Sequence, residues 1–345
     1  MGKPTLTLRR MSANGACVAT SERPVLVGGC ARSGTTLLRS MLNSHPDLAV
    51  PHETKFVVTA WRNRDRFGDL TRVENRRAVA RWILELPNTR FTRLGIEPDE
   101  LTEAFAAAPP TLGSLMAACF SRYAEHHGKP RWGDKRPSYS RNLDALFRLF
   151  PQFQFVHVVR DPRACAASMR RAWDGWGRVA SAAEVWERTD KAVRAARRGL
   201  PAGQFLEIYY EHLVAEPEQT LEQICGFLGL DPTGVPKMLD YHRNGVDLPR
   251  DKLYGNAAKP VSTTAVQRWM SDLSEPEIAF LEHVLGDRIR AHGYDLTAAG
   301  TPVPADQLAD YRSLRSRRDR EALRRRLVEL KRKATYRQPT AAQRL

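Results

Sequence analysis

Residues 24–53 read PVLVGGCARSGTTLLRSMLNSHPDLAVPHE, and this stretch decides the fold. Its first four residues form a short apolar run that predicts a buried strand. Gly28 and Gly29 end the run, residues 30–34 predict a tight loop, and a helical apolar period begins at Thr35. A strand, a glycine-containing loop and a helix start together offer backbone N–H groups and a positive dipole end to an anion. The stretch therefore predicts an α/β domain with an anion site after its first strand.

The loop has the glycine spacing of the phosphate loop G-x-x-x-x-G-K-[ST], from Gly29 to Gly34, with one departure. Thr35 occupies the position of the lysine, and the cation is Arg32, inside the loop. Because this lysine is missing, and no apolar strand ends in a metal-binding aspartate, the loop argues against a nucleotide triphosphatase. It favours another phosphate-like group, and a glycine turn with only a structural role is the alternative.

Size, charge and cysteine content restrict the class of protein. The chain has 345 residues, enough for one large α/β domain with an insertion, and a formal net charge of +15. Residues 306–345 contribute 13 Lys or Arg and 5 Asp or Glu, so the remainder is only mildly basic. The five cysteines lie far apart without metal-ligand or redox spacing, which favours a reduced, cytoplasmic protein. We expect residues 1–22 to be a flexible leader, with no signal peptide or membrane span.

The remaining segments predict how the domain is built. Residues 56–128 show helical periodicity and no strand pattern, so they predict a helical insertion that lies over the sheet. Residues 153–159 and 205–210 are apolar runs that predict two further strands. Helices between them predict a parallel, P-loop-like sheet in a three-layer α/β fold. After a linker at 297–305, residues 306–333 predict an Arg-rich C-terminal helix.

Two more charged segments predict functional chemistry. Residues 131–137 read RWGDKRP and place Lys135 in a dense group of charges, either as a catalytic cation or as a surface lysine. Arg160 follows the second apolar strand and Ser168 comes eight residues later. An arginine at a strand end can bind phosphate with two parallel N–H bonds, so a second anion site is predicted here. The alternative is that Arg160 pairs with Asp161 or with a helix end.

These motifs resemble the sulfotransferases that use 3′-phosphoadenosine-5′-phosphosulfate (PAPS). The resemblance is strongest to protein-tyrosine sulfotransferases and their bacterial relatives, and it covers roughly residues 24–296 with gaps. It is carried by Gly28-Gly29, Arg32 to Thr36, His45-Pro46-Asp47 and Glu53-Thr54, and then by the later charged segments. It implies a sulfotransferase domain over 23–296 that moves a sulfuryl group from PAPS to an acceptor hydroxyl without a metal.

The resemblance also implies a role for individual residues. Glu53 would remove the proton of the acceptor hydroxyl, and an exposed loop glutamate is the alternative. Lys135 and Arg32 would stabilise the transition state. The 5′-phosphosulfate would be held by Arg32, Ser33, Gly34, Thr35 and Thr36; the 3′-phosphate by Arg160 and Ser168, with Arg163 as a helper; and the nucleotide site would be completed by Tyr210 and Lys259. Whether His52 takes part is open.

Other functions and partners also fit the sequence. A P-loop kinase or nucleotide triphosphatase would predict metal-dependent ATP binding. A basic nucleic-acid-binding protein would predict strongly salt-dependent binding to any duplex. The C-terminal helix fits a self-association arm, a membrane-surface helix or an anion-binding arm. The acceptor itself is not legible, because a small molecule or secondary metabolite, a glycan, a lipid or a peptide tyrosine would all provide a hydroxyl.

Overall fold

A computed structural model of the chain describes residues 23–172, 178–243 and 259–335. Its centre is a five-stranded sheet in the order β2-β3-β1-β4-β5, in which all neighbouring strands are parallel. Ligands of such sheets bind beyond the carboxyl ends of the strands, where the strand order reverses. The first strand, β1, lies in the middle of the sheet; the chain then passes to the edge strand β2, returns to β3, and crosses to β4 and β5 on the other side, so this position falls at β1. The strands are β1 (Val25–Gly29), β2 (Leu48–Ala49), β3 (Arg131–Lys135), β4 (Gln154–Val159) and β5 (Phe205–Tyr209).

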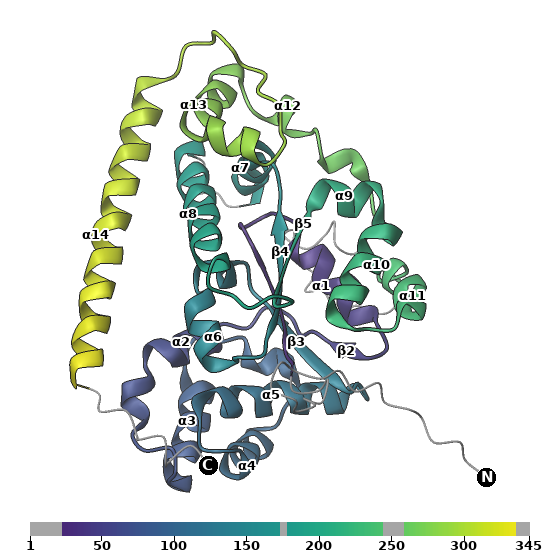
Figure 1. The fold of residues 1–345 in the computed structure, drawn as a ribbon, viewed down its shortest axis with the longest axis vertical. Coiled ribbons are helices and arrows are strands. Elements are labelled where there is room, and N and C mark those ends of the chain that lie inside the picture. Colours follow the sequence, from purple (N-terminus) through teal and green to yellow (C-terminus); the bar gives the residue numbers. More distant parts are fainter. Residues whose placement is uncertain (1–22, 173–177, 244–258, 336–345) are drawn as a thin grey trace.

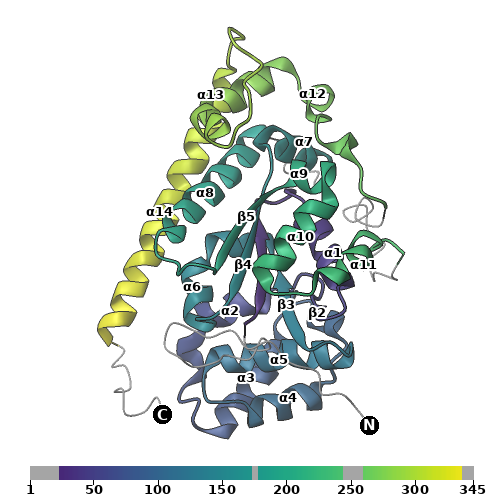
Figure 2. The same cartoon turned by 45° about the vertical axis from the view of Figure 1, so that its right-hand side comes forward.

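The alternation of side chains along β1 separates the two helical layers. Val25 and Val27 pack on one face with Val156 and Val158, whereas Leu26 and Phe155 pack on the other. Figures 1 and 2 show helices on both faces, which confirms the predicted three-layer parallel fold. The first face is covered by α1 (Thr35–Ser44), α9 (Tyr210–Ala215), α10 (Pro217–Leu228), η5 (Pro232–Gly234) and α11 (Val235–Leu239), and the second by η4 (Pro137–Arg141), α6 (Leu143–Leu149) and α8 (Val179–Arg197).

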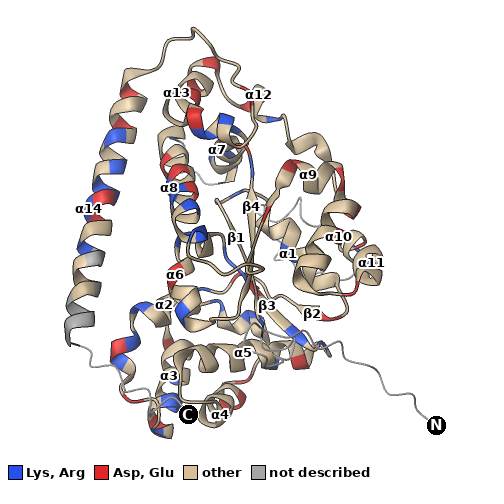
Figure 3. Cartoon of the chain, in the orientation of Figure 1, with Lys and Arg blue, Asp and Glu red and all other residues tan. Residues whose placement is uncertain are grey.

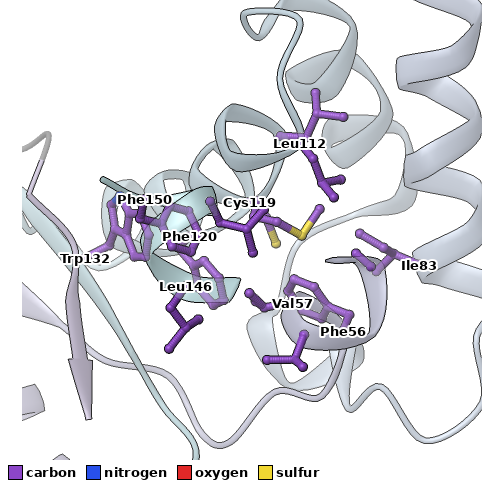
Figure 4. Close-up of a cluster of buried hydrophobic side chains, with 14 of the residues drawn as sticks. Phe56, Val57, Ile83, Leu112, Cys119, Phe120, Trp132, Leu146 and Phe150 are labelled. Carbon is purple, nitrogen blue, oxygen red and sulfur yellow. The ribbon is translucent and has the colours of Figure 1, made fainter. Parts of the chain in front are cut away.

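The predicted helical insertion is present between β2 and β3. It joins the sheet through aromatic packing: the ring of Phe120 stacks on Phe56 at 5.6 Å and on Trp132 of β3 at 5.0 Å between centroids. Figure 4 shows this cluster, and Figure 1 shows α3 and α4 at the end of the molecule opposite α13. The insertion comprises α2 (Phe56–Arg62), η2 (Arg64–Phe67), α3 (Val73–Glu85), η3 (Phe91–Leu94), α4 (Pro98–Ala107) and α5 (Leu112–His126).

A third apolar cluster covers the opposite end of the molecule and holds the predicted C-terminal helix. Within it, Tyr311 is buried and its hydroxyl donates to Glu187 Oε2 of α8 at 2.7 Å. The first half of the C-terminal helix is thereby fixed to α8, while Figure 1 shows its second half standing away from the body. The helices here are α7 (Pro162–Ala172), α12 (Trp269–Asp272), α13 (Glu275–Ala291) and α14 (Ala305–Thr335), while η7 (Thr263–Ala265) packs through Ala265 against the cluster on the first face. Across the described ranges, none of the helices is long and apolar enough to cross a membrane.

The sequence did not predict the two-residue strand β2, which lies in a turn-rich segment, nor strand β3. Strand β3 reads RWGDK, and all five of its residues are buried. The charges are tolerated because each finds partners inside the protein. Arg131, for example, donates from Nη1 to the Leu228 carbonyl at 2.6 Å and from Nε to the Arg23 carbonyl at 3.0 Å. A central strand with three charged residues lacks the apolar pattern by which buried strands are identified.

Candidate active site

The loop after β1 has the backbone geometry of an anion cradle. Ser33 N–H donates to the Cys30 carbonyl at 3.1 Å, and both Arg32 (φ 68°) and Gly34 (φ 96°) adopt left-handed conformations. A Cβ on Gly34 would lie 2.3 Å from Cδ2 of Tyr210, so the ring leaves no space for a side chain. Helix α1 begins directly afterwards at Thr35, and its N-terminal N–H groups provide the positive end of the helix at this loop.

The predicted second anion site lies against this loop. Arg160, which follows β4, donates from Nη1 to the Arg32 carbonyl at 3.0 Å. Its guanidinium carbon lies 4.1 Å from the centre of the Tyr210 ring. In turn, Arg32 Nε donates to Ser168 Oγ at 3.1 Å. Residues that are more than a hundred positions apart in sequence therefore form one cluster, and the structure brings Arg32, Gly34, Arg160, Ser168 and Tyr210 together.

Two buried polar atoms in this cluster have no hydrogen-bond partner among the described residues. They are Ser33 Oγ, whose residue is fully buried, and Arg160 Nε. A buried polar atom without a partner carries a free-energy cost unless a ligand or water satisfies it. The two atoms come from the two predicted anion sites, so their placement fits a ligand with an acceptor group at each.

Further arginines surround the cluster, and the sequence did not single them out. The pKa of Arg171 is lowered first by burial and then by the nearby charges of Arg268, Arg160 and Arg32. Arg171 also forms an ion pair with Asp272. A shift caused by like charges reports a positive potential that an anion would relieve. Arg171 and Arg268 lie in segments without a motif, and only the folded arrangement reveals them.

The candidate base and cation meet beside the loop helix. Lys135 ends β3, and its Nζ lies 3.6 Å from Glu53 Oε2 and 3.3 Å from Thr36 Oγ1. The Lys135 side chain is 2% exposed, while that of Glu53 is 22% exposed and thus open to a substrate. Burial lowers the pKa of Lys135, and the Glu53 carboxylate is the largest influence that opposes this shift. The pair provides a carboxylate and an ammonium group at the start of α1.

Glu53 is held in this position by residues on both sides of it. The buried Arg39 of α1 donates from Nε to the Val50 carbonyl at 2.7 Å and fixes the turn before Glu53. On the other side, Thr54 Oγ1 donates to Asp134 Oδ2 at 2.9 Å. Asp134 directly precedes Lys135 in β3, so one strand positions both the base and the cation. These supporting contacts were not predicted, because they depend on the position of β3, which has no apolar pattern in the sequence.

The remaining predicted residues have different surroundings. Burial first, and then Arg39 and Lys135, lower the pKa of His52 to about 3, so its ring is neutral near pH 7. Lys259 is exposed, and its backbone carbonyl accepts a hydrogen bond from the Tyr241 hydroxyl.

Arg163 does not point to the loop. Its guanidinium pairs with Asp161 at 2.7 Å and with Glu282. Asp161 therefore pairs with Arg163 and not with Arg160. Because Nε, Nη1 and Nη2 of Arg163 already donate to these two carboxylates, we assign Arg163 a structural role.

Asp134 is expected to make stability depend on pH. Burial raises its pKa to about 6, against the hydrogen bonds from Tyr139 and Thr54. Because the pKa of this carboxyl is higher in the folded than in the unfolded protein, the folded protein is favoured while the carboxyl is protonated. The free energy of unfolding therefore falls as the pH rises from about 4 to about 6. We expect wild type to lose about 1–3 kcal/mol in unfolding free energy relative to Asp134→Asn across this window. Urea unfolding at several pH values measures the difference, and parallel curves for the two proteins would contradict it.

Comparison with known proteins places this site in a family. A model of the sulfotransferase family matches residues 24–233. Protein-tyrosine sulfotransferase 2 of Gallus gallus is 27% identical over 288 residues, covering 80% of this chain and 71% of that protein. The nodulation protein NoeE of Sinorhizobium fredii is 27% identical over 293 residues, covering 77% of this chain and 65% of that protein. The chain belongs to the sulfotransferase family, which confirms the enzyme class predicted from the sequence motifs.

A solved structure shares the fold. The sulfotransferase domain of the Synechococcus olefin synthase superposes with a TM-score of 0.61 at 24% sequence identity, over 80% of this chain and 96% of that domain. The match covers most of the body, so the arrangement of the sheet and its flanking helices is that of a sulfotransferase domain.

Proposed function

We propose that the protein transfers a sulfuryl group from PAPS to a hydroxyl of an acceptor, with Glu53 as the general base. The observation that carries this proposal is the contact chain at the start of α1. Glu53 Oε2 lies 3.6 Å from Lys135 Nζ, which lies 3.3 Å from Thr36 Oγ1 beside the anion-binding loop. Glu53 accepts the proton of the hydroxyl, and Lys135 supplies positive charge where negative charge develops.

The residues of the site fit the donor. PAPS would supply the sulfuryl group together with a phosphate leaving group, and it carries a second phosphate on its ribose. Ser33, Thr35, Thr36 and the N–H groups of α1 would hold the phosphosulfate end. Arg160 Nε and Ser168 would hold the 3′-phosphate end, with Tyr210 between the two loops and Lys259 as a further cation. Guanidinium, ammonium and N–H groups supply the positive charge, so we propose that the reaction requires no metal.

The surroundings of Glu53 favour an acceptor that carries negative charge. Arg90 Nη1, from the insertion, lies 3.8 Å from Glu53 Oε2. The pKa of Lys55 is lowered first by burial and then by the charge of Arg90, with Arg136 and Arg93 acting in the same direction. An anionic group next to the reacting hydroxyl would relieve this repulsion. Small molecules, glycans, lipids and peptide tyrosines can all carry such a group.

One experiment tests the activity without assuming the acceptor. The full chain is incubated with PAPS labelled in its sulfuryl group and an extract of its own cells, in the presence of a metal chelator. We expect label to move to one main class of product, which mass spectrometry then identifies. If no label moves while the protein binds PAP in calorimetry, the donor assignment is supported and the transfer is not. If PAP does not bind at all, the proposed donor is wrong.

A P-loop kinase or nucleotide triphosphatase is the second candidate, because the loop has the spacing of a nucleotide site. Thr35 takes the place of the lysine that such enzymes use, which counts against this candidate. Calorimetry with ATP and magnesium distinguishes the two, since the sulfotransferase should prefer PAP. The only support for nucleic-acid binding is the basic C-terminal segment. A cytoplasmic location stays a prediction.

Arg160 should recognise the 3′-phosphate. We expect Arg160→Ala to weaken PAP binding by about 10- to 100-fold, because a charged hydrogen bond to phosphate contributes on the order of 1.5–3 kcal/mol. Binding of adenosine 5′-phosphosulfate, which lacks that phosphate, should change by only a few-fold. Arg170→Ala, in the same helix region but paired with Glu277, is the matched control and should leave both affinities unchanged. Equal losses for the two nucleotides would reject the assignment.

A further inference from the structure

The C-terminal half of α14 presents apolar side chains to solvent. Its first half is fixed to the body through Tyr311, with Leu308 and Leu314 packed against the same cluster. After Leu314, the large apolar side chains of the helix are exposed instead of packed against the body. The exposed residues are Leu323 (58%), Leu327 (51%), Val328 (50%) and Leu330 (53%). Figures 1 and 2 both show this half standing free of the domain.

Three of these residues form a stripe on one side of the helix. At about 100° per residue, Leu323, Leu327 and Leu330 fall within roughly 60° of one another. Of the residues that pack on the body, Tyr311 and Leu314 lie more than about 100° from the middle of the stripe, and Leu308 lies about 70° from it. Val328 lies off the stripe by about 100° or more. The middle of the stripe is therefore about 130° from the middle of the face that packs on the body, so most of the stripe is turned away from it.

The sequence around the stripe is strongly basic. Residues 317–335 contain nine Lys or Arg and three Asp or Glu, a net charge of +6. Arg320 and Arg324 are exposed and flank the stripe on one side. Figure 3 shows basic residues, with a few acidic ones among them, along the coloured part of α14. Long basic side chains beside an apolar stripe can keep their charge in water while the stripe is buried in a lipid interface.

A second copy of the chain fits this surface poorly. The spacing of Leu323, Leu327 and Leu330 matches a coiled-coil seam, but the preceding seam positions are Ser316 and Arg320. The apolar seam thus extends over about two turns, whereas coiled coils need three or four heptads. Two copies would also bring segments of net charge +6 together. An anionic surface removes that repulsion and requires no matching seam.

We propose that the C-terminal half of α14 binds the surface of an anionic membrane, with its Leu stripe at the acyl boundary and its arginines at the headgroups. This binding attaches the sulfotransferase to a bilayer through a segment distinct from the site. It does not depend on the proposed sulfuryl transfer, and it holds whichever acceptor is used. The expected signature is binding that needs both negative lipid and the Leu stripe.

Co-sedimentation of the full chain with vesicles tests the proposal. We expect wild type to pellet with vesicles of equimolar phosphatidylcholine and phosphatidylglycerol, and to stay in solution with phosphatidylcholine alone. The triple variant Leu323→Ser, Leu327→Ser, Leu330→Ser should lose about tenfold or more in partition coefficient. The pair Arg320→Gln, Arg324→Gln should bind several-fold more weakly and show a reduced salt dependence.

Controls and other outcomes follow from the same helix. Val328→Ser removes an equally exposed apolar residue off the stripe and should bind like wild type. Unchanged PAP binding and unfolding midpoint in each variant show that the body is intact. Equal binding to both vesicle types, no binding to either, or full binding by the triple variant would each overturn the proposal. If analytical sedimentation shows a dimer for wild type and a monomer for the triple variant, the stripe binds a second copy of the chain. That result also overturns the membrane proposal.

Discussion

Replacing Glu53 by Gln is expected to lower kcat by about two to four orders of magnitude while PAP affinity changes by no more than a few-fold. Glutamine is nearly isosteric and can still accept a hydrogen bond, but it cannot take the hydroxyl proton. The carboxylate lies at the exposed edge of the site, 3.6 Å from Lys135, so it is placed to meet an acceptor and not to hold the nucleotide. Turnover with the identified acceptor and calorimetry with PAP measure the two quantities separately.

Controls distinguish a base from a general loss of negative charge. Glu125→Gln removes an exposed carboxylate that pairs with Arg122 in α5, and kcat should not change. Glu53→Asp keeps the charge with a shorter reach and should recover part of the loss. If Glu53→Gln retains full turnover, the base is elsewhere, and the neutral His52 ring becomes the next residue to test.

The parts of the site that could be predicted from the sequence share one property. Arg32, Gly34 and Arg160 follow apolar strands, and parallel strands bring their carboxyl ends to one edge of the sheet. A local pattern therefore predicted a long-range contact, which the structure shows between Arg160 and the Arg32 carbonyl. The predicted fold was right for the same reason, because β1, β4 and β5 are clear apolar runs and the helical insertion has clear periodicity.

The residues that support the site could not be predicted from local sequence patterns. Strand β3 has no apolar pattern, since Arg131, Asp134 and Lys135 are charged and buried together. Without β3 in the sheet, no local pattern predicts that Asp134 accepts from Thr54, and only the family resemblance places Lys135 near Thr36. Arg39 likewise sits on a helix face that periodicity leaves uncertain, and its role appears only in its bonds to the carbonyls before Glu53. Charged groups satisfied by tertiary contacts leave no local signature.

Lys135→Met should lower kcat by about two to three orders of magnitude, because it removes a placed cation from where charge develops in the transition state. PAP affinity should fall by less, since the loop N–H groups and Arg160 remain. Burial lowers the pKa of Lys135, so a methionine of similar length avoids a desolvation cost and the variant should stay folded. Stopped reactions with labelled PAPS give kcat, and thermal unfolding reports the fold.

The matched control is Lys129→Met, which removes a half-buried lysine that donates to the Asn43 and Leu48 carbonyls. It should affect stability and leave kcat nearly unchanged. Lys135→Arg provides a second readout: an arginine keeps its proton at alkaline pH, so any activity it restores should persist to higher pH than in wild type. If Glu53 served only to orient Lys135, Glu53→Gln would add nothing in the Lys135→Met background. Separate roles predict a further loss in the double variant, because the proton is still removed by Glu53 when the cation is absent.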